Sequence, residues 1–167
     1  MSGRVLDDLT LFQGLSQEDR ERVLPMFAPD YFPAGTVLFE QGDLAAQLYI
    51  VLEGEVSIRY KPEDGPPLIV SRVHDEGVVG WSAAIGSPTY TSAAVCTADC
   101  YVLRVRSTDL RHLCEEYPQT GSLLLERLAA LIAERLRNTH PQVIAMLEHG
   151  LHANGDKPFS ARWLNSK

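Results

Sequence analysis

A glycine-rich stretch in the middle of the chain has the composition of an anion-binding loop. Residues 77–95 are GVVGWSAAIGSPTYTSAAV, which predicts one short helical turn after Gly80, a break at the following Gly-x-Pro and then a strand. Glycine allows other groups to approach the backbone closely, and the first N–H groups of a helix carry a partial positive charge. We therefore expect the backbone N–H groups of Trp81, Ser82 and Ala83 to form a cradle for an anion.

The segments that must position this stretch are mostly short and strand-like. An N-terminal helix, capped by Ser16, is expected to end before Pro29, and strand-like periodicity begins at Tyr31. Apolar runs separated by Gly or Pro turns predict strands at 36–40, 48–52, 56–60, 68–73 and 100–105. Short strands at this spacing are typical of an antiparallel sandwich or barrel. The fold class is therefore predicted to be mainly β with flanking helices.

Helical patterns dominate the chain after the last predicted strand. A short helix capped by Ser107 is expected to end at Pro118. The longest helical signal follows, with apolar residues three and four positions apart: Leu123, Leu124, Leu125, Leu128, Leu131, Ile132 and Leu136. A helix this apolar needs cover on more than one side. We therefore predict a homodimer through residues 119–140, in which one face lies on the sheets and the other on the same helix of a second chain.

Several parts of the sequence resemble the cyclic nucleotide-binding domains of the catabolite activator protein family. The pattern VGxSA at residues 79–83, followed by GxP at 86–88 and a Ser/Thr-Ala strand, resembles the phosphate-binding cassette of that family. LFQGLSQEDRERV resembles the usual start of such a domain, and PAGTVLFEQGD with LYIVLEGEVSI resembles its β-roll. The resemblance covers roughly residues 9–140. It implies a double-stranded β-helix, or jelly roll, with an N-terminal helix and a long C-terminal helix.

The chain is expected to have three parts. Residues 1–118 hold the N-terminal helix and the β-roll, and residues 119–150 hold the C-terminal helix and a short helix after it. Residues 151–167 are polar and interrupted by Gly and Pro, which is typical of a loose tail.

The two side chains that read a nucleotide in the family are absent here. The resemblance places a ribose-binding Glu after the cassette glycine and a phosphate-pairing Arg later, and Trp81 and Tyr90 occupy these positions. Charge-assisted hydrogen bonds contribute about 1.5 to 3 kcal/mol each, so losing both lowers affinity by about two to four orders of magnitude. Three alternatives remain: a pocket filled by the two rings, a slot for a different small molecule, and a weak cyclic nucleotide site. We expect no cofactor.

The resemblance also implies roles for hydroxyl side chains. Ser82 and Thr91 match cassette positions that contact phosphate oxygens; alternatively, they and Ser92 cap the turn and pair within the strand. Thr139 matches a Thr that reaches the ligand base from the end of the family's C-terminal helix, although it also suits a plain helix cap. The predicted ligand-binding residues are Gly80, Trp81, Ser82, Ala83, Tyr90, Thr91, Ser92 and Thr139.

Charge and hydropathy argue against nucleic acid and membrane partners. The net charge of −7 disfavours duplex binding, which depends largely on Lys and Arg. Only 27 residues follow His140, too few for the helix-turn-helix that many members of the family carry. The sequence has neither a signal-peptide core nor an apolar run of the roughly 18 to 20 residues that span a bilayer. We therefore expect a cytoplasmic protein that binds neither DNA nor membranes.

Enzymatic chemistry has little support in the sequence. A cupin-like metal site needs several His and a Glu on neighbouring strands, but His74 is the only His before Cys100. A Gly-x-Ser-x-Gly elbow is also absent. We predict a non-enzymatic sensory or regulatory module that signals through its C-terminal helix to a protein partner or a sister subunit. If its pocket is filled, it acts as a constitutive dimerisation or docking domain.

Overall fold

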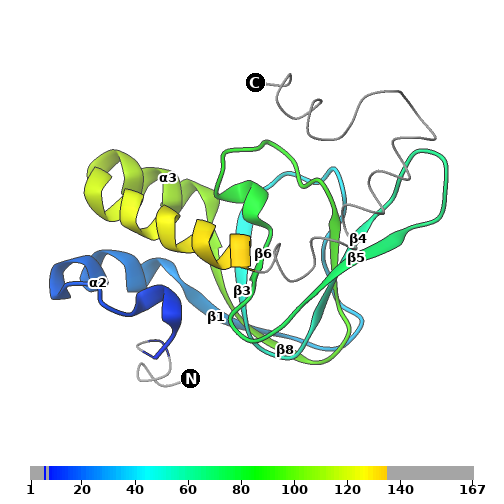
Figure 1. Ribbon diagram of the computed structural model, residues 1–167, viewed down its shortest axis with the longest axis horizontal. Coiled ribbons are helices and arrows are strands. Elements are labelled where there is room, and N and C mark those ends of the chain that lie inside the picture. The colour runs from blue at the N-terminus through cyan, green and yellow to red at the C-terminus, as the bar shows by residue number, and fades with distance from the viewer. Residues whose placement is uncertain (1–5, 7, 135–167) are drawn as a thin grey trace.

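The computed structural model describes residue 6 and residues 8–134, which form two packed β-sheets with helices gathered on one side (Figure 1). Each sheet has four antiparallel strands, in the orders β1-β8-β3-β6 and β2-β7-β4-β5. The strands are β1 Ala28–Phe32, β2 Val37–Phe39, β3 Gln47–Glu53, β4 Val56–Tyr60, β5 Leu68–Val73, β6 Val78–Val79, β7 Ala93–Cys96 and β8 Cys100–Arg106. The predicted mainly β jelly roll is confirmed.

The core of the roll lies between the two sheets. Phe39 on β2 stacks against Tyr49 on β3 of the other sheet, with ring centres 6.3 Å apart. The four residues 48–51 of β3 are all buried, because β3 has a neighbour on each side and is covered on both faces. Strand β3, which lies beside the cassette strand β6, is therefore fixed by hydrogen-bonded neighbours at its edges and by packing on both faces.

The N-terminal helix is shorter than expected, and strand β1 occupies residues that were assigned to the end of that helix and to a turn. Helix α2 spans Gln17–Val23, and the 3-10 helix η2, Leu24–Met26, follows it. Pro29 lies inside β1, opposite Leu103 of β8. Because β1 is the edge strand of its sheet, one of its sides lacks a partner, and a proline is tolerated there.

Two helices follow β8. Helix α3 spans Ser107–Glu116, and its N-cap is Arg106 rather than the expected Ser107 cap. The Arg106 side chain reaches into the first turn instead, where its Nε lies 3.0 Å from Asp109 Oδ2. Helical conformation resumes at residue 118 and continues to residue 134, the last that is described. Within the described part of the chain, every helix is too short or too polar to cross a bilayer.

One side of this last helix is packed against its own chain. Leu124 and Leu128 are each 1% exposed, whereas Leu125 and Ile132 are only partly buried. The partly buried residues are those available to a second copy. The predicted dimer contact itself stays a prediction, and residues 135–140 of it lie outside the described residues.

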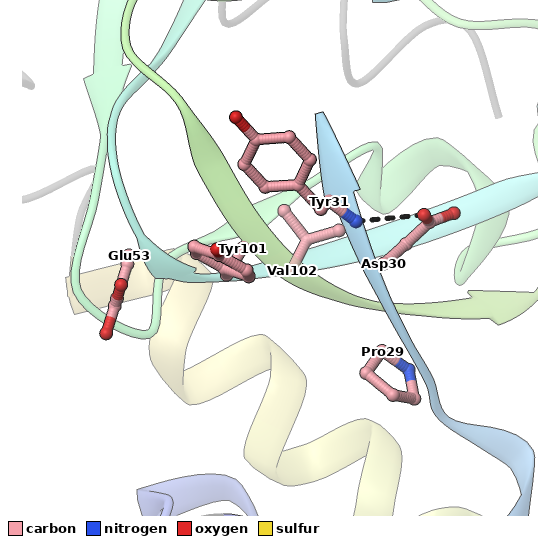
Figure 2. A pocket seen from close by; sticks show the side chains of 6 residues that line it. All are labelled: Pro29, Asp30, Tyr31, Glu53, Tyr101 and Val102. Carbon is pink, nitrogen blue, oxygen red and sulfur yellow. Dashed lines mark hydrogen bonds between the residues drawn. The ribbon is translucent and has the colours of Figure 1, made fainter. Parts of the chain in front are cut away.

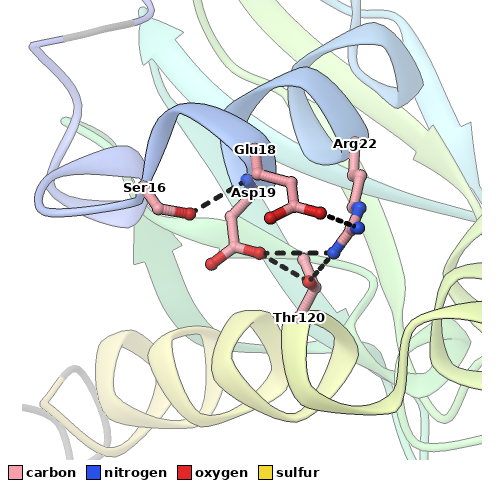
Figure 3. Close-up of polar contacts among 5 residues, drawn as sticks. All are labelled: Ser16, Glu18, Asp19, Arg22 and Thr120. Atoms are coloured by element: carbon pink, nitrogen blue, oxygen red, sulfur yellow. Dashed lines mark hydrogen bonds and ion pairs between the residues drawn. The ribbon is translucent and has the colours of Figure 1, made fainter.

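Polar contacts join the last helix to the N-terminal helix α2 (Figure 3). The Thr120 hydroxyl donates to Asp19 Oδ1 at 2.6 Å and accepts from Arg22 Nη1 at 3.3 Å. Two helical turns later, the Arg127 guanidinium donates to the backbone carbonyls of Leu11 and Gln13. The two ends of the described chain are therefore connected by side chains that bridge more than 95 residues of sequence.

Candidate functional site

The predicted cassette is a sharp turn followed by a short 3-10 helix, η3, Trp81–Ala83. Gly80 has φ of +79°, in the left-handed region that glycine adopts without strain. The N–H of Ala83 donates to the carbonyl of Gly80 at 3.0 Å, so it is not available to an anion. The expected cradle of three backbone donors is therefore wrong for Ala83.

Gly80 is required by space as well as by its backbone angle. A Cβ atom at this position would lie 2.9 Å from the carbonyl oxygen of Gln47, and 3.2 and 3.3 Å from ring carbons of Tyr90 and Phe39. The strand β3 and two aromatic rings thus press directly on the cassette turn. A larger residue at this position would clash with that packing.

Tyr90 is part of the core of the roll. It is 5% exposed, and its ring stacks on Phe39 with centres 3.6 Å apart and planes at 12°. Its hydroxyl donates to the carbonyl of Gln47 at 2.5 Å and accepts from the N–H of Gln47 at 3.0 Å. Burial raises the pKa of Tyr90, which keeps the phenol neutral. The Tyr90 hydroxyl proton is therefore donated to the backbone of β3 and is not available to a ligand.

The other predicted site residues lie at different depths. Ser82 is buried, Trp81 is partly buried against the core, Ser92 is partly buried and Thr91 is exposed. Gly80 lies beside the Tyr90 ring, which an added Cβ would approach to 3.2 Å. Thr139 lies outside the described residues. Charged residues are absent from the whole segment 77–98. The segment itself offers a ligand hydroxyls, backbone and rings.

Ser71 is a polar residue of the roll interior that the sequence did not single out. It lies opposite Ile58, which in turn lies opposite Ala94, a residue with no exposed surface. Paired residues share a face of the sheet, so the Ser71 side chain is on the inner face. Its buried hydroxyl has no hydrogen-bond partner within the described part of the chain. The sequence could not have indicated this, because a serine within an alternating strand gives no sign of whether its hydroxyl will have a hydrogen-bond partner.

A shallow pocket lies on the sheet β1-β8-β3-β6, and none of its lining residues belongs to the cassette (Figure 2). Its volume is about 580 Å³, and it is lined by Pro29, Asp30, Tyr31, Glu53, Tyr101 and Val102. The strands β1 and β8 and the end of β3 contribute these residues. Among the residues that the structure describes, three or more His, Cys, Asp or Glu side chains do not come together as a metal site.

The comparison with protein families agrees with the roll and its cassette. Residues 29–117, more than half of the chain, match the model of the cyclic nucleotide-binding domain. This chain belongs to the cyclic nucleotide-binding domain family. The matched part of this cyclic nucleotide-binding domain contains all eight strands except the first residue of β1, as well as the cassette.

Proteins similar to this domain include receptors and regulatory subunits. The cyclic AMP receptor protein of Thermus thermophilus is 29% identical over 127 residues, 76% of this chain. A cyclic nucleotide-binding protein from Geobacter metallireducens has a solved structure with a TM-score of 0.71, 27% identity and coverage of 81% of this chain and 98% of its own. The first curated relatives are longer proteins, of which this chain spans between 14% and 57%.

A more distant structural relative is described as independent of cyclic AMP. It is the regulatory subunit of a cAMP-independent protein kinase A from Trypanosoma brucei, solved as a triple mutant with cAMP bound. One of its three substitutions replaces a threonine with an arginine. The structure has a TM-score of 0.61 and 17% identity, and it covers 80% of this chain and 45% of its own. At this identity the likeness concerns the fold.

Proposed function

We propose that this cyclic nucleotide-binding domain is a non-enzymatic regulatory module that does not respond to cyclic AMP or cyclic GMP. The observation that carries the proposal is the absence of any charged residue between Gly77 and Ala98, the segment that contains the cassette. A cyclic phosphodiester is an anion, and charge-assisted hydrogen bonds are roughly twice as strong as neutral ones. Because this cassette segment contains no cation, it can bind the phosphodiester only through neutral side chains and backbone groups.

The packing of Tyr90 supports the proposal. Its ring and the Phe39 ring are stacked face to face, and both lie within 3.3 Å of the position a Cβ would take at Gly80. A ligand that displaced Tyr90 would break this stack and leave two backbone groups of Gln47 without partners. Unpaired buried groups cost about 1 to 3 kcal/mol each, which a weakly held anion does not recover.

Titration calorimetry with cyclic AMP and cyclic GMP tests the proposal on two proteins. The wild type is expected to show no binding in the micromolar range. A double variant, Trp81→Glu with Thr91→Arg, introduces a carboxylate and a cation at the cassette, and Thr91 is exposed, so the arginine does not enter the core. It is expected to bind at least about a hundredfold more tightly, because two charge-assisted contacts contribute about 3 to 6 kcal/mol.

A matched control distinguishes an arginine that contacts the nucleotide from an arginine that only adds positive charge to the protein. Thr108→Arg places the same side chain at an exposed position of α3, away from the cassette, and is expected to leave binding unchanged. Micromolar binding of either cyclic nucleotide by the wild type would refute the proposal. Equal gains from Thr91→Arg and Thr108→Arg would show that the cassette is not the site.

A different small molecule is the second candidate, and Ser71 favours it. A buried hydroxyl without a partner is rare in folded proteins, because it costs free energy that a bound hydrogen-bonding group would recover. Native mass spectrometry of freshly purified protein would detect a co-purified ligand. Loss of that ligand in Ser71→Ala would assign it to the roll interior, and an unliganded wild-type mass would remove this candidate.

We also propose that the signal passes through the last helix to a sister subunit. Leu123, Leu125, Leu131 and Ile132 are only partly buried by their own chain, which supports a second copy as their cover. Light scattering on the full chain should give the mass of a dimer. Leu125→Glu with Ile132→Glu should shift it to the monomer, whereas Ser122→Glu, an exposed neighbour, should not. A monomeric wild type would contradict the proposal.

A further inference from the structure

The shallow pocket on the sheet β1-β8-β3-β6 is built around two exposed tyrosines. Tyr31 and Tyr101 lie directly opposite each other on β1 and β8, and their ring centres are 4.9 Å apart. They are 44% and 48% exposed, although they share a sheet face with Leu103, which is completely buried. β1 is the edge strand, so no strand of the described chain lies beyond Tyr31. Figure 2 shows the two rings together, with Glu53 beyond Tyr101.

The charged groups around these rings are carboxylates. Glu53 lines the pocket, and Asp99 precedes β8 with its Oδ1 2.8 Å from the N–H of Ala34. Asp99 is two residues before Tyr101, and burial and this neighbouring carboxylate both raise the pKa of Tyr31. Neither carboxylate has an ion-pair partner among residues 8–134.

The other acidic residue in the lining is already neutralised. Asp30 Oδ2 lies 3.2 Å from Arg104 Nε. Arg104 is three residues after Tyr101 on β8, and an odd separation along a strand puts it on the opposite face. The rings, Glu53 and Asp99 therefore form a face that is negative and aromatic, with no cation of its own in the described part of the chain.

The same molecule shows which cation suits such a face. On the helical side, the guanidinium carbon of Arg22 lies 4.0 Å from the centre of the Tyr117 ring, and Arg22 also pairs with Glu18. A planar guanidinium stacks on an aromatic ring and still reaches a carboxylate at its edge. A lysine ammonium is a compact, strongly hydrated charge and cannot make both contacts as well.

We propose that the pocket lined by Tyr31 and Tyr101 is a docking site for an arginine side chain of a partner protein. The guanidinium stacks on the tyrosine rings and pairs with Glu53 or Asp99, as Arg22 does with Tyr117 and Glu18. The argument for this occupant is charge complementarity. The site is independent of the cassette, so it stands whether or not the cassette binds a ligand.

The test uses the full chain and a pentapeptide, acetyl-Gly-Gly-Arg-Gly-Gly-amide, observed by NMR. The arginine peptide is expected to shift the resonances of residues 29–31, 53 and 99–102. The same peptide with citrulline, which has nearly the same shape and no charge, is expected to bind at least about tenfold more weakly. Raising the salt concentration should weaken binding of the arginine peptide and leave that of the citrulline peptide unchanged.

Variants assign the binding to the pocket. Tyr101→Val keeps a strand-forming residue and removes one ring, and it should weaken binding about tenfold; Glu53→Gln should weaken it about threefold. Tyr60→Val removes a tyrosine from the other sheet and should have no effect on binding. Tyr31→Val serves as a second ring variant if Tyr101→Val does not fold. Equal binding of arginine and citrulline peptides, shifts confined to other residues, or no shifts at all would overturn the proposal.

Discussion

The cassette and the helical layer of this domain are held by different kinds of contact. At the cassette, the rings of Phe39 and Tyr90 stack beside the Gly80 turn, and the Tyr90 hydroxyl makes two hydrogen bonds to the backbone of Gln47. In the helical layer, charged side chains join the last helix to α2 and to the residues before it (Figure 3). The first region depends on stacked rings and neutral hydrogen bonds, and the second combines its packed leucines with hydrogen bonds from charged side chains.

This difference indicates which region is able to move. Packed rings lose stacking, burial and hydrogen bonds together when they shift, so the cassette has one stable arrangement. The helices are joined by a small number of hydrogen bonds, each with a net contribution of about 0.5 to 3 kcal/mol, so a rearrangement of the helices gives up fewer contacts at once. In this domain the last helix is the better candidate for a moving part, and the cassette for a fixed one.

The largest expected effect is that of removing the Tyr90 ring. Tyr90→Ala should lower the free energy of unfolding by about 3 to 5 kcal/mol, because it leaves a cavity beside Phe39 and Gly80. Urea unfolding monitored by circular dichroism measures this loss. A change below 1 kcal/mol would break the comparison, because the cassette would then not depend on packing.

A milder variant at the same position separates the ring from its hydroxyl. Tyr90→Phe retains the stack on Phe39 and leaves the N–H and C=O of Gln47 without their partner. It should cost about 1 to 3 kcal/mol, less than the alanine variant. If both variants cost the same, the hydroxyl rather than the packed ring would hold the cassette.

Alkaline pH should destabilise the roll through its buried neutral groups. Burial, with a smaller contribution from Tyr90, raises the pKa of Tyr49 to about 12 from its ordinary value of 10.0. The folded state thus favours the protonated phenol, so its contribution is complete below pH 10 and is lost as the pH rises towards 12. The loss should reach about 2 to 3 kcal/mol, at 1.36 kcal/mol per pKa unit. Unfolding measured from pH 9 to 12 tests this.

Tyr49→Phe provides the control for the pH dependence. Without the phenol, the free energy of unfolding should fall less steeply between pH 10 and 12, because one proton fewer is released on unfolding. A decline should remain, because burial and the nearby Cys100 also raise the pKa of Cys96 to about 12. An unchanged slope in Tyr49→Phe would mean that the buried phenol does not contribute.

Most of the fold was predictable, because glycine and proline turns separate apolar strands at regular spacing. The cassette was predictable for the same reason, since Gly80 and the Gly-x-Pro at 86–88 mark its turns. Strand β1 was not, because Pro29 normally ends regular structure, and only the position of β1 at a sheet edge makes it acceptable.

The orientation of single side chains was the part that the sequence left open. Residues 86–92 have no regular alternation, so nothing local indicates that Tyr90 is buried while its neighbour Thr91 is exposed. The tyrosine pocket depends on the pairing of Tyr31 with Tyr101, which are 70 positions apart. Such contacts follow from strand register, which depends on the whole sheet.

The next largest effect is expected from Arg127 in the helical layer. Arg127→Ala removes donors to the carbonyls of Leu11 and Gln13 and should cost about 1 to 2 kcal/mol in the free energy of unfolding. Hydrogen exchange of residues 8–15 should accelerate more than that of the strands, because the contact lies outside the roll. Arg111→Ala, an exposed arginine of α3, is the matched control and should change neither quantity.

The smallest effect is expected from the bridge between the last helix and α2. Thr120→Val keeps the side-chain shape and removes the hydroxyl that links Asp19 and Arg22, and it should cost about 1 kcal/mol. Because Asp19 and Arg22 are charged, the difference between wild type and variant should shrink as salt is added. The cost of Tyr90→Phe, which involves only neutral groups, should stay constant over the same range. If salt reduced both costs equally, the two regions would not differ in the kind of contact that holds them.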